Sequence, residues 1–401
     1  MITATWKQLG SVRMPIVHTC TTTRVTGAPV AIATISSGSG GKLRITTSTA
    51  HGIEDKDICK LAGIFNLPQN RTRVSVISST VVDCLDINYS SSYTLQSGTI
   101  QRDNQGVHVR AVVTALGKQV VLVSSVFSFD VSPFLASTLK EQTHPTPALN
   151  SVSNSGGQMA CTYSVQLQEW GLNAQGVLEA YLAAGSTVQQ TSLQAYMAAN
   201  PAEYFGQKSL NLLRQVKVSR FRPVYISYAF NSSGGTPGFR VIRYSGGNST
   251  STNYPGAAGS LVLTIALQVE NFDWLVIYPT VGDTISGSAV YIYPNERACV
   301  KPLTWQNRNG AREIAELPEL EVAADVAVRQ YRKSFAFTDS VGERANIATV
   351  EVSDVSILES LAEARDVVYD GKQASIAERK PVVSSRDLKI QTLKIRWIAS
   401  E

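Results

Sequence analysis

The chain has 401 residues, of which 43% are hydrophobic and only 17% are charged, and its formal net charge is +5. The charged fraction lies below the ~25% of ordinary soluble domains, which favours antiparallel sheets, long loops and subunit contacts over a helical enzyme. The small positive charge is only weak support for an anionic partner, so we expect no specific nucleic acid.

Cysteine usage and the N-terminus bear on the compartment. The five cysteines are widely spaced, which favours buried reduced thiols over disulfides or metal ligands: Cys20, Cys59, Cys84, Cys161 and Cys299. Residues 1–6 lack a charged region followed by an apolar one, so no signal peptide is expected. No apolar run approaches the ~20 residues that span a bilayer. We expect a protein without a membrane span, made in a cytoplasm and soluble there.

The chain is long enough for about two to three domains. The first predicted domain is a β-sandwich over residues 1–145. Residues 12–19 are expected to form an edge strand, because Pro15 cannot donate a hydrogen bond to a neighbouring strand. Residues 107–123 alternate on either side of a Leu-Gly-Lys turn, which is a strong hairpin signal. We expect strand 12–19 to join this hairpin.

A small barrel is predicted to interrupt this sandwich at about residues 42–100. Behind the Gly/Ser-rich entry 36–41, the segment contains five short strands, enough for a small closed sheet. His51 precedes a glycine and is expected to form a turn rather than to bind a metal or act in catalysis. The acidic residues that follow lack the spacing of a calcium loop and are interpreted as a solvated turn: Glu54, Asp55 and Asp57.

The second predicted domain, residues 146–300, is β-rich with long loops. Residues 159–170 and 224–228 alternate between apolar and polar side chains, as strands do. Between them, segment 172–205 is ambiguous, because residues 191–199 have some helical character.

Two features of this domain have both a functional and a structural interpretation. Residues 231–238 and 245–259 are rich in Gly, Ser and Asn and are expected to be long loops, which are usually functional or form interfaces. Loop 231–259 is therefore an assembly candidate, with an idle surface loop as the alternative. The basic residues of 208–222 could grip phosphates, but we favour a surface facing solvent or an acidic neighbour: Lys208, Arg214, Lys217, Arg220 and Arg222.

Three successive runs near the end of this domain are expected to form an antiparallel meander. Residues 260–269, 274–278 and 288–293 each alternate with a period of two, and turn residues separate them.

The third predicted domain, residues 301–401, is a β domain with a short helix. The helix is expected at about 354–365, because Ser356 and Glu359 have capping-box spacing and apolar residues follow at helical intervals.

The remainder of this domain offers one large aromatic residue and several strands. Polar loop 304–310 carries Trp305, which we interpret as a core anchor, with use at an interface as the alternative. Residues 367–371 are expected to form a strand with a turn. The last strands are expected at 388–390 and 393–397, with a bulge between them.

The expected fold class is mainly β, with antiparallel β-sandwich domains, an inserted small β-barrel and one or two short helices. No pair of acidic residues is singled out for glycoside hydrolysis, and no Gly-x-Ser-x-Gly elbow accompanies the four histidines. The sequence predicts no catalytic, cofactor-binding or metal-binding residue, no cofactor, and a protein that is not an enzyme.

Four short motifs in the barrel segment lie at positions 50–53, 57–58, 61–63 and 74–76, which read Ala-His-Gly-Ile, Asp-Ile, Leu-Ala-Gly and Val-Ser-Val. In this order they resemble the small barrel inserted in many phage tail and fibre proteins. That family usually has Gly-Asp in the acidic turn, whereas this chain has Lys-Asp.

A wider set of motifs lies at positions 15–17, 129–132 and 305–310, which read Pro-Ile-Val, Phe-Asp-Val-Ser and Trp-Gln-Asn-Arg-Asn-Gly. With the inserted barrel and the late helix-strand-strand ending, they resemble tail and virion-associated proteins of Bacteroidetes-type phages and prophages over most of the chain. In that family the tryptophan loop often reads Trp-Leu-Asn-Arg-Leu-Gly-Gly, whereas this chain has Ala311 at the second Gly.

This resemblance implies a structural protein of the virion tail, in a tail tip, baseplate or tail-proximal ring, made in the host bacterial cytoplasm. Its expected partners are other copies of itself, in a ring-like homo-oligomer, and other tail proteins. The alternative is a receptor- or carbohydrate-binding fibre module, in which tyrosines would stack on a host-surface glycan: Tyr225, Tyr228, Tyr291 and Tyr293.

Overall fold

The computed structural model describes residues 2–22, 27–103, 107–172, 177–181, 185–231, 235–270, 274–297, 299–334, 337–352, 354–377 and 391–398. The fold is mainly β, as predicted, and the described residues include two α-helices, α1 (Ser132–Lys140) and α2 (Val355–Leu361). Neither is long and apolar enough to cross a membrane.

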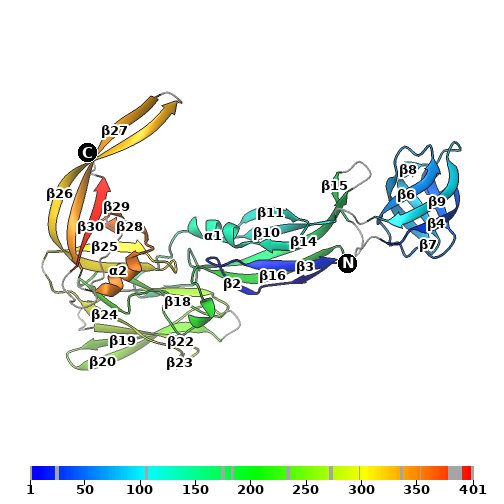
Figure 1. Ribbon diagram of the computed structural model, residues 1–401. Coiled ribbons are helices and arrows are strands. Elements are labelled where there is room, and N and C mark those ends of the chain that lie inside the picture. Colours follow the sequence, from blue (N-terminus) through cyan, green and yellow to red (C-terminus); the bar gives the residue numbers. More distant parts are fainter. Residues whose placement is uncertain are drawn as a thin grey trace. The chain divides into compact units, whose positions relative to one another are not determined.

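The chain divides into two compact units (Figure 1). The first contains residues 1–9, 15–135 and 162–194, and the second contains residues 10–14, 136–161 and 195–401. The predicted domain limits at 145/146 and 300/301 stay predictions.

The inserted barrel of the first unit is closed by six strands, in the order β4-β5-β8-β7-β6-β9. The strands are β4 (Val30–Ser37), β5 (Lys42–Thr47), β6 (Ile58–Phe65), β7 (Arg71–Ser78), β8 (Val81–Asn88) and β9 (Thr94–Arg102). The five strands expected within 42–100 are present as β5 to β9, with β9 ending at Arg102, but the barrel also needs a sixth strand, β4, which lies before the Gly/Ser stretch. That stretch is the turn between β4 and β5, where Gly40 and Gly41 adopt φ of 64° and 73°.

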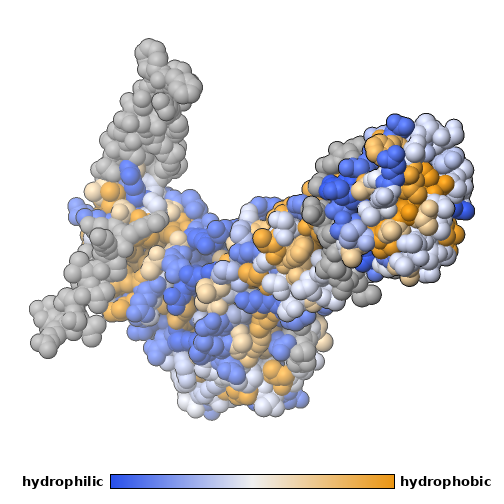
Figure 2. Space-filling view, turned by 45° about the vertical axis from the view of Figure 1, so that its right-hand side comes forward, coloured by the Kyte–Doolittle hydropathy of each residue, from blue (hydrophilic) through white to orange (hydrophobic). Residues whose placement is uncertain are grey.

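The barrel has its own core and a mixed surface. Alternate residues of its strands point inward, including Leu43, Ile45 and Val74, which are fully buried. Asp83 is held by Arg44, with 2.6 Å between Nε and Oδ1. Phe65 and Ile77 are more than half exposed, and Figure 2 shows orange, hydrophobic patches on the visible face of this barrel.

The rest of the first unit is a β-sandwich. One sheet has the order β1-β3-β12, and the other has β11-β10-β14-β16-β2 with β15 paired to β14. The strands are β1 (Ile2–Thr5), β2 (Leu9–Ser11), β3 (Val17–Thr22), β10 (His108–Ala115), β11 (Lys118–Ser124), β12 (Ser128–Asp130), β14 (Ala160–Leu172), β15 (Leu178–Ala180) and β16 (Thr187–Tyr196). Buried His18 of β3 hydrogen-bonds to the Tyr163 hydroxyl of β14, so the two sheets face each other.

One expectation for this sandwich is wrong, and one ambiguous segment forms a strand. Strand 12–19 does not join hairpin 107–123: Pro15 lies between β2 and β3, and β3 belongs to the opposite sheet. Residues 191–196 are not helical but part of β16, because Leu193 and Ala195 alternate into the sandwich core and this burial outweighs helical propensity. The hairpin itself forms as predicted, from β10 and β11.

The second unit contains another β-sandwich. Its smaller sheet has the order β13-β21-β18, and its larger sheet has β17-β24-β22-β19-β20 with β23 paired to β22. The strands are β13 (Ser151–Ser153), β17 (Gln215–Val218), β18 (Val224–Ala229), β19 (Pro237–Ser245), β20 (Asn248–Pro255), β21 (Val262–Leu267), β22 (Trp274–Val281), β23 (Thr284–Ile285) and β24 (Val290–Pro294).

The predicted meander is only partly correct. β22 and β24 are antiparallel neighbours. β21, however, lies in the opposite sheet, where it pairs with β13 and β18. All six residues of β21 are buried, so it is a central strand covered on both faces, which its alternating sequence did not reveal.

The predicted loop 231–259 is largely a hairpin, which corrects that expectation. β19 and β20 pair from Ser245↔Asn248 to Gly238↔Pro255, which leaves only Pro237 of β19 without a partner on β20. The turn is Gly246-Gly247, with φ of 55° and 83°, the left-handed conformations that a two-residue hairpin turn requires. Glycines therefore mark a tight turn here, not a long loop.

A second closed barrel completes this unit, with the order β25-β26-β27-β30-β29-β28. The strands are β25 (Val300–Gln306), β26 (Arg312–Ser334), β27 (Phe337–Val352), β28 (Arg365–Tyr369), β29 (Lys372–Ile376) and β30 (Gln391–Ile398). The expected helix and the expected strand at 367–371 are present. Asp354, rather than Ser356, caps the helix by accepting from the Ser356 N–H at 2.9 Å. The predicted strand 388–390, with its bulge, lies outside the described residues.

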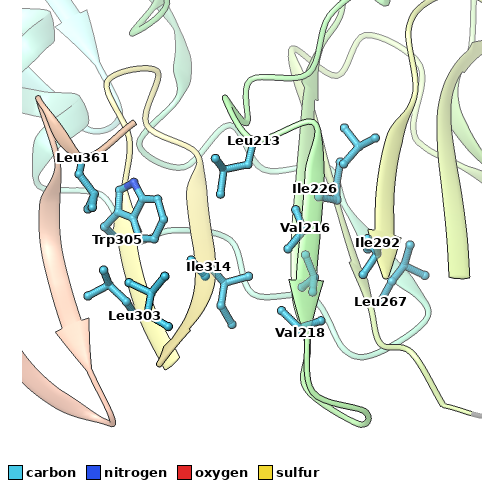
Figure 3. Close-up of a cluster of buried hydrophobic side chains, with 14 of the residues drawn as sticks. Leu213, Val216, Val218, Ile226, Leu267, Ile292, Leu303, Trp305, Ile314 and Leu361 are labelled. Carbon is cyan, nitrogen blue, oxygen red and sulfur yellow. The ribbon is translucent and has the colours of Figure 1, made fainter. Parts of the chain in front are cut away.

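One hydrophobic core runs through the second unit. It includes residues on both sides of position 300, from Leu213 to Trp397. Figure 3 shows this continuity, with Trp305 and Leu361 at one end, Val216 and Val218 in the middle, and Leu267 at the other end. The sandwich and the second barrel are thus packed as one body.

Candidate binding surfaces

The outer face of the larger sheet in the second unit carries a row of aromatic side chains. Along β19, β22 and β24, buried residues such as Val241, Ile277 and Ile292 alternate with half-exposed ones. The half-exposed aromatic residues form what we call the aromatic strip: Tyr244, Trp274, Tyr278, Tyr291 and Tyr293.

The rings of the strip are stacked in a regular way. Tyr244 and Trp274 lie opposite each other on β19 and β22, with ring centroids 3.8 Å apart and 4° between the planes. Trp274 lies 6.1 Å from Tyr293 at 24°, and Tyr291 and Tyr293 are 6.4 Å apart at 8°. Such pairs are worth ~0.5–1.5 kcal/mol beyond the area they bury, so the strip is an ordered surface.

The strip covers an apolar residue and has a polar border. Val276 points to the same outer face but is only 2% exposed. Burial and the neighbouring hydroxyls of Tyr291 and Tyr244 raise the pKa of Tyr278, so that hydroxyl stays protonated at neutral pH. Polar side chains lie at outward positions beside the strip: Gln215, Lys217, Arg240, Ser249, Ser251 and Asn253.

The tyrosines predicted to stack on a glycan are not all brought together. Tyr291 and Tyr293 lie in the strip. Tyr228 is fully buried and donates its hydroxyl to the Ser288 carbonyl at 2.7 Å. Tyr225 lies under the Arg312 guanidinium, whose carbon is 5.4 Å from the ring centroid. The sequence missed Tyr244, Trp274 and Tyr278, although alternation along β22 places Trp274 and Tyr278 on one face.

Most of the predicted basic stretch is neutralised by carboxylates. Lys208 pairs with Glu203 at 3.5 Å, and Arg220 approaches Glu296 at 3.8 Å. Arg222 contacts Glu316 at 2.7 Å, and that carboxylate is 1% exposed. These contacts agree with the interpretation of a surface facing acidic neighbours.

Trp305 is a core anchor, as predicted. It is 1% exposed, and its indole Nε1 donates to Ser360 Oγ at 2.9 Å. The polar loop after it is buried too. Asn307 donates to the Leu210 carbonyl at 3.0 Å and to Glu313 Oε1 at 2.6 Å.

Glu313 is the most enclosed carboxyl group of this region. It is 1% exposed and accepts hydrogen bonds from the Leu212 N–H, Asn307 and Asn211. Burial raises the pKa of Glu313 to about 7, although the hydrogen bonds from these donors lower it.

His51 forms a turn, as predicted. Its Nδ1 accepts from the Ile53 N–H at 2.9 Å, so Nε2 carries the proton and donates to the Ser78 carbonyl at 3.0 Å. The acidic turn is not fully solvated, which corrects that interpretation: Asp57 is 0% exposed and lies 2.6 Å from Arg102 Nε. Among the described residues, no group of three His, Cys, Asp or Glu could hold a metal ion.

All five cysteines are free thiols, and four of them are buried. Cys299 is exposed, which differs from the expectation of uniformly buried thiols.

Comparison with known proteins leaves the family open. No protein-family model matches the chain, and no curated protein matches it. Among solved structures, one described as "Ca2+-stabilized adhesin helps an Antarctic bacterium reach out and bind ice" has a TM-score of 0.15 and 10% sequence identity, over 92% of this chain and 96% of that chain. A likeness this low carries no argument about fold or function.

Proposed function

We propose that this chain is a structural protein of a phage virion tail that works by assembly of identical copies rather than by catalysis. Its place would be a tail tip, baseplate or tail-proximal ring, with other tail proteins as neighbours, after synthesis in the host bacterial cytoplasm. Support comes from the sequence resemblance, and from one feature of the second barrel.

That feature is a long hairpin, which we call the arm. β26 and β27 are 23 and 16 residues long, whereas their partners β25 and β30 are 7 and 8. β25 pairs with β26 only as far as Pro318, and β30 pairs with β27 only from Ala345 onward. Figure 1 shows the two strands continuing past the barrel.

The outer part of the arm has no other described strand beside it. Residues 326–334 and 337–344 pair only with each other within the described part of the chain. A two-stranded ribbon is marginally stable in water, because it cannot bury a hydrophobic face. We infer that the arm is stabilised by a neighbouring copy, which receives it as an extra pair of strands or against a sheet.

The test is to shorten the arm. Asp325 and Ala345 lie opposite each other in the register, so residues 326–344 can be replaced by Asn-Gly, a preferred two-residue hairpin turn. The full-length chain should form a ring visible by electron microscopy, and the shortened chain should remain folded but have a lower mass by light scattering. A full-length chain that is monomeric, or an oligomer that survives shortening unchanged, would contradict the proposal.

A second candidate function is glycan binding at the aromatic strip. Aromatic rings stack on the apolar faces of sugar rings, and the polar border offers hydroxyl, amide and ammonium groups for sugar hydroxyls. Trp274→Ala should abolish binding on a glycan array, whereas Tyr225→Ala, outside the strip, should leave it unchanged. If the unmodified chain binds no glycan, this candidate fails and the assembly proposal is unaffected.

A further inference from the structure

The β20 edge is the exposed side of β20, at one end of the larger sheet in the second unit. Among the described strands, β20 pairs only with β19. Residues 248–253 are all exposed, and the pairing with β19 runs from end to end without a bulge. The outer side of β20 is therefore a straight row of backbone donors and acceptors.

This edge lacks the features that usually protect sheet edges. Natural edge strands are short, charged, bulged or interrupted by proline, which prevents pairing with another chain. Positions 248–254 contain only Asn, Ser, Thr and Tyr, and the proline of this strand, Pro255, is its last residue. The opposite end of the same sheet shows the usual protection, since β17 has four residues and includes Lys217. An unprotected edge of this length indicates that a partner covers it.

The hairpin turn decides which backbone groups are available. Ser245 and Asn248 flank a two-residue turn, and such flanking residues exchange both backbone hydrogen bonds. The pattern repeats at every second residue, so Asn248, Thr250 and Thr252 bond to β19. The N–H and C=O groups of Ser249, Ser251 and Asn253 therefore point away from the sheet.

We propose that β20 pairs with β20 of a second copy of this chain, around a two-fold axis that passes midway between Ser251 and Ser251 of the second copy. This inference rests on the proposed function, from which it takes a second copy of the chain as the partner. It adds the surface and the symmetry of one contact between copies. Opposite residues of an antiparallel pair share a face, and an axis normal to the sheet keeps each residue on its face. One residue of β20 must therefore lie directly opposite its own counterpart across the axis.

In the register around Ser251, the residues whose backbone groups point away from the sheet form hydrogen-bonded pairs with the second copy. Ser251 lies opposite Ser251 of the second copy, and Ser249 lies opposite Asn253, and these are the residues with free backbone groups. Thr250 then lies opposite Thr252 as a non-hydrogen-bonded pair, in which side chains are closest. The Thr250–Thr252 pair is of a kind that is favourable across strands, and no charges are brought together. The strand is thus complementary to itself, as a two-fold contact requires.

A proline substitution tests the backbone contact. The Ser251 N–H points away from β19, so Ser251→Pro removes a donor from the free edge without breaking the hairpin. We expect the mass of the assembly, by analytical ultracentrifugation, to fall at least twofold. Ser251→Thr keeps the N–H and should leave the mass unchanged. Val123→Lys alters β11, another edge strand with a 53% exposed valine, and should also leave it unchanged.

Cysteine cross-linking tests the register. Only the residue beside the axis lies opposite its own counterpart, at the ~5.5 Å Cα separation of a hydrogen-bonded pair, which a disulfide can span. In a Cys299→Ser background, which removes the exposed native thiol, Ser251→Cys should form a disulfide-linked dimer on mild oxidation. Asn253→Cys, which lies opposite Ser249, should not.

The outcomes separate this inference from the assembly proposal. If the mass is insensitive to Ser251→Pro and Ser251→Cys links no better than Asn253→Cys, the β20 contact is wrong. If in addition shortening the arm lowers the mass, the assembly proposal stands without it. If Ser251→Cys forms the disulfide-linked dimer and Ser251→Pro lowers the mass, the β20 contact holds. If, in the same experiments, shortening the arm leaves the mass unchanged and no ring is seen, the arm-based proposal fails.

Discussion

Glu313 makes the stability of the second unit depend on pH. Burial raises its pKa to about 7 in the folded chain, against 4.5 for an exposed carboxyl. A carboxyl with a raised pKa contributes most to stability below its unfolded pKa, and this contribution is lost as the pH rises through the folded value. The loss therefore falls between about pH 4.5 and pH 7.

Substitution by glutamine tests this dependence. Glu313→Gln imitates the protonated carboxyl, so between pH 5 and pH 8 the unfolding free energy of the unmodified chain should fall by about 1–3 kcal/mol relative to that of the variant. Urea unfolding at pH 5 and pH 8 measures both chains. His18 and His144, whose pKa values burial lowers to about 4, titrate in both chains and cancel in the comparison. Parallel curves for the two chains would contradict the assignment.

The cysteines differ in reactivity for a physical reason. Burial raises the pKa of Cys20 to about 11 and that of Cys161 to about 12, and it raises those of Cys59 and Cys84 as well. A thiol reacts as the thiolate and only when reagent reaches it. Ellman's reagent at pH 8 should therefore titrate one thiol, Cys299, in the native chain and all five after unfolding.

Cys299→Ser provides the control for this titration. The variant should show no fast-reacting thiol in the native state. A second fast thiol in the unmodified chain would show that a core opens more readily than its burial implies.

At the scale of elements, the β19–β20 hairpin depends on its turn. Gly246 and Gly247 have φ of 55° and 83°, which costs an L-residue with a Cβ roughly 1–2 kcal/mol. Gly246→Ala and Gly247→Ala should each speed hydrogen exchange in β19 and β20. Gly246→Asn should not, because asparagine tolerates this conformation. Equal effects of Ala and Asn would mean that the turn does not set the register.

Elements with local signals could be predicted from the sequence. The hairpin at Leu116-Gly117 and the turn at Asp370-Gly371 each have two positive φ values in succession. Each is predictable from a glycine between two segments in which apolar and polar residues alternate. The glycines of segment 231–259 predict a loop, whereas the structure has a hairpin, because the burial of Phe239 and Val241 depends on the opposite sheet.

Residues brought together by distant pairing could not be predicted. The aromatic strip joins three strands, so it exists only once their register is known. Two of the groups that enclose Glu313, Asn211 and Leu212, lie about a hundred positions earlier in the chain.

At the scale of the molecule, the inserted barrel should behave as an independent module. Its buried core residues all lie between Ile32 and Ile100, although Ile58 also packs with Val107 and Tyr181 outside the barrel. Excising residues 30–102 and closing the gap with a short Gly/Ser linker should leave a soluble chain with strand-type circular dichroism. Excising 42–100 should aggregate, because it leaves β4 as an unpaired strand. Equal solubility of the two products would contradict these limits.

The chain enters and leaves this barrel at one point. The Gly27 N–H donates to the Arg102 carbonyl at 3.1 Å, and Val30 of β4 lies opposite Ile100 of β9. The two adjacent ends form an insertion site, at which any domain with neighbouring termini can be placed without disturbing the fold of the sandwich. Recombination between related genes can therefore replace the barrel as a unit. The surface of the barrel can then change while the residues that fold the sandwich stay the same.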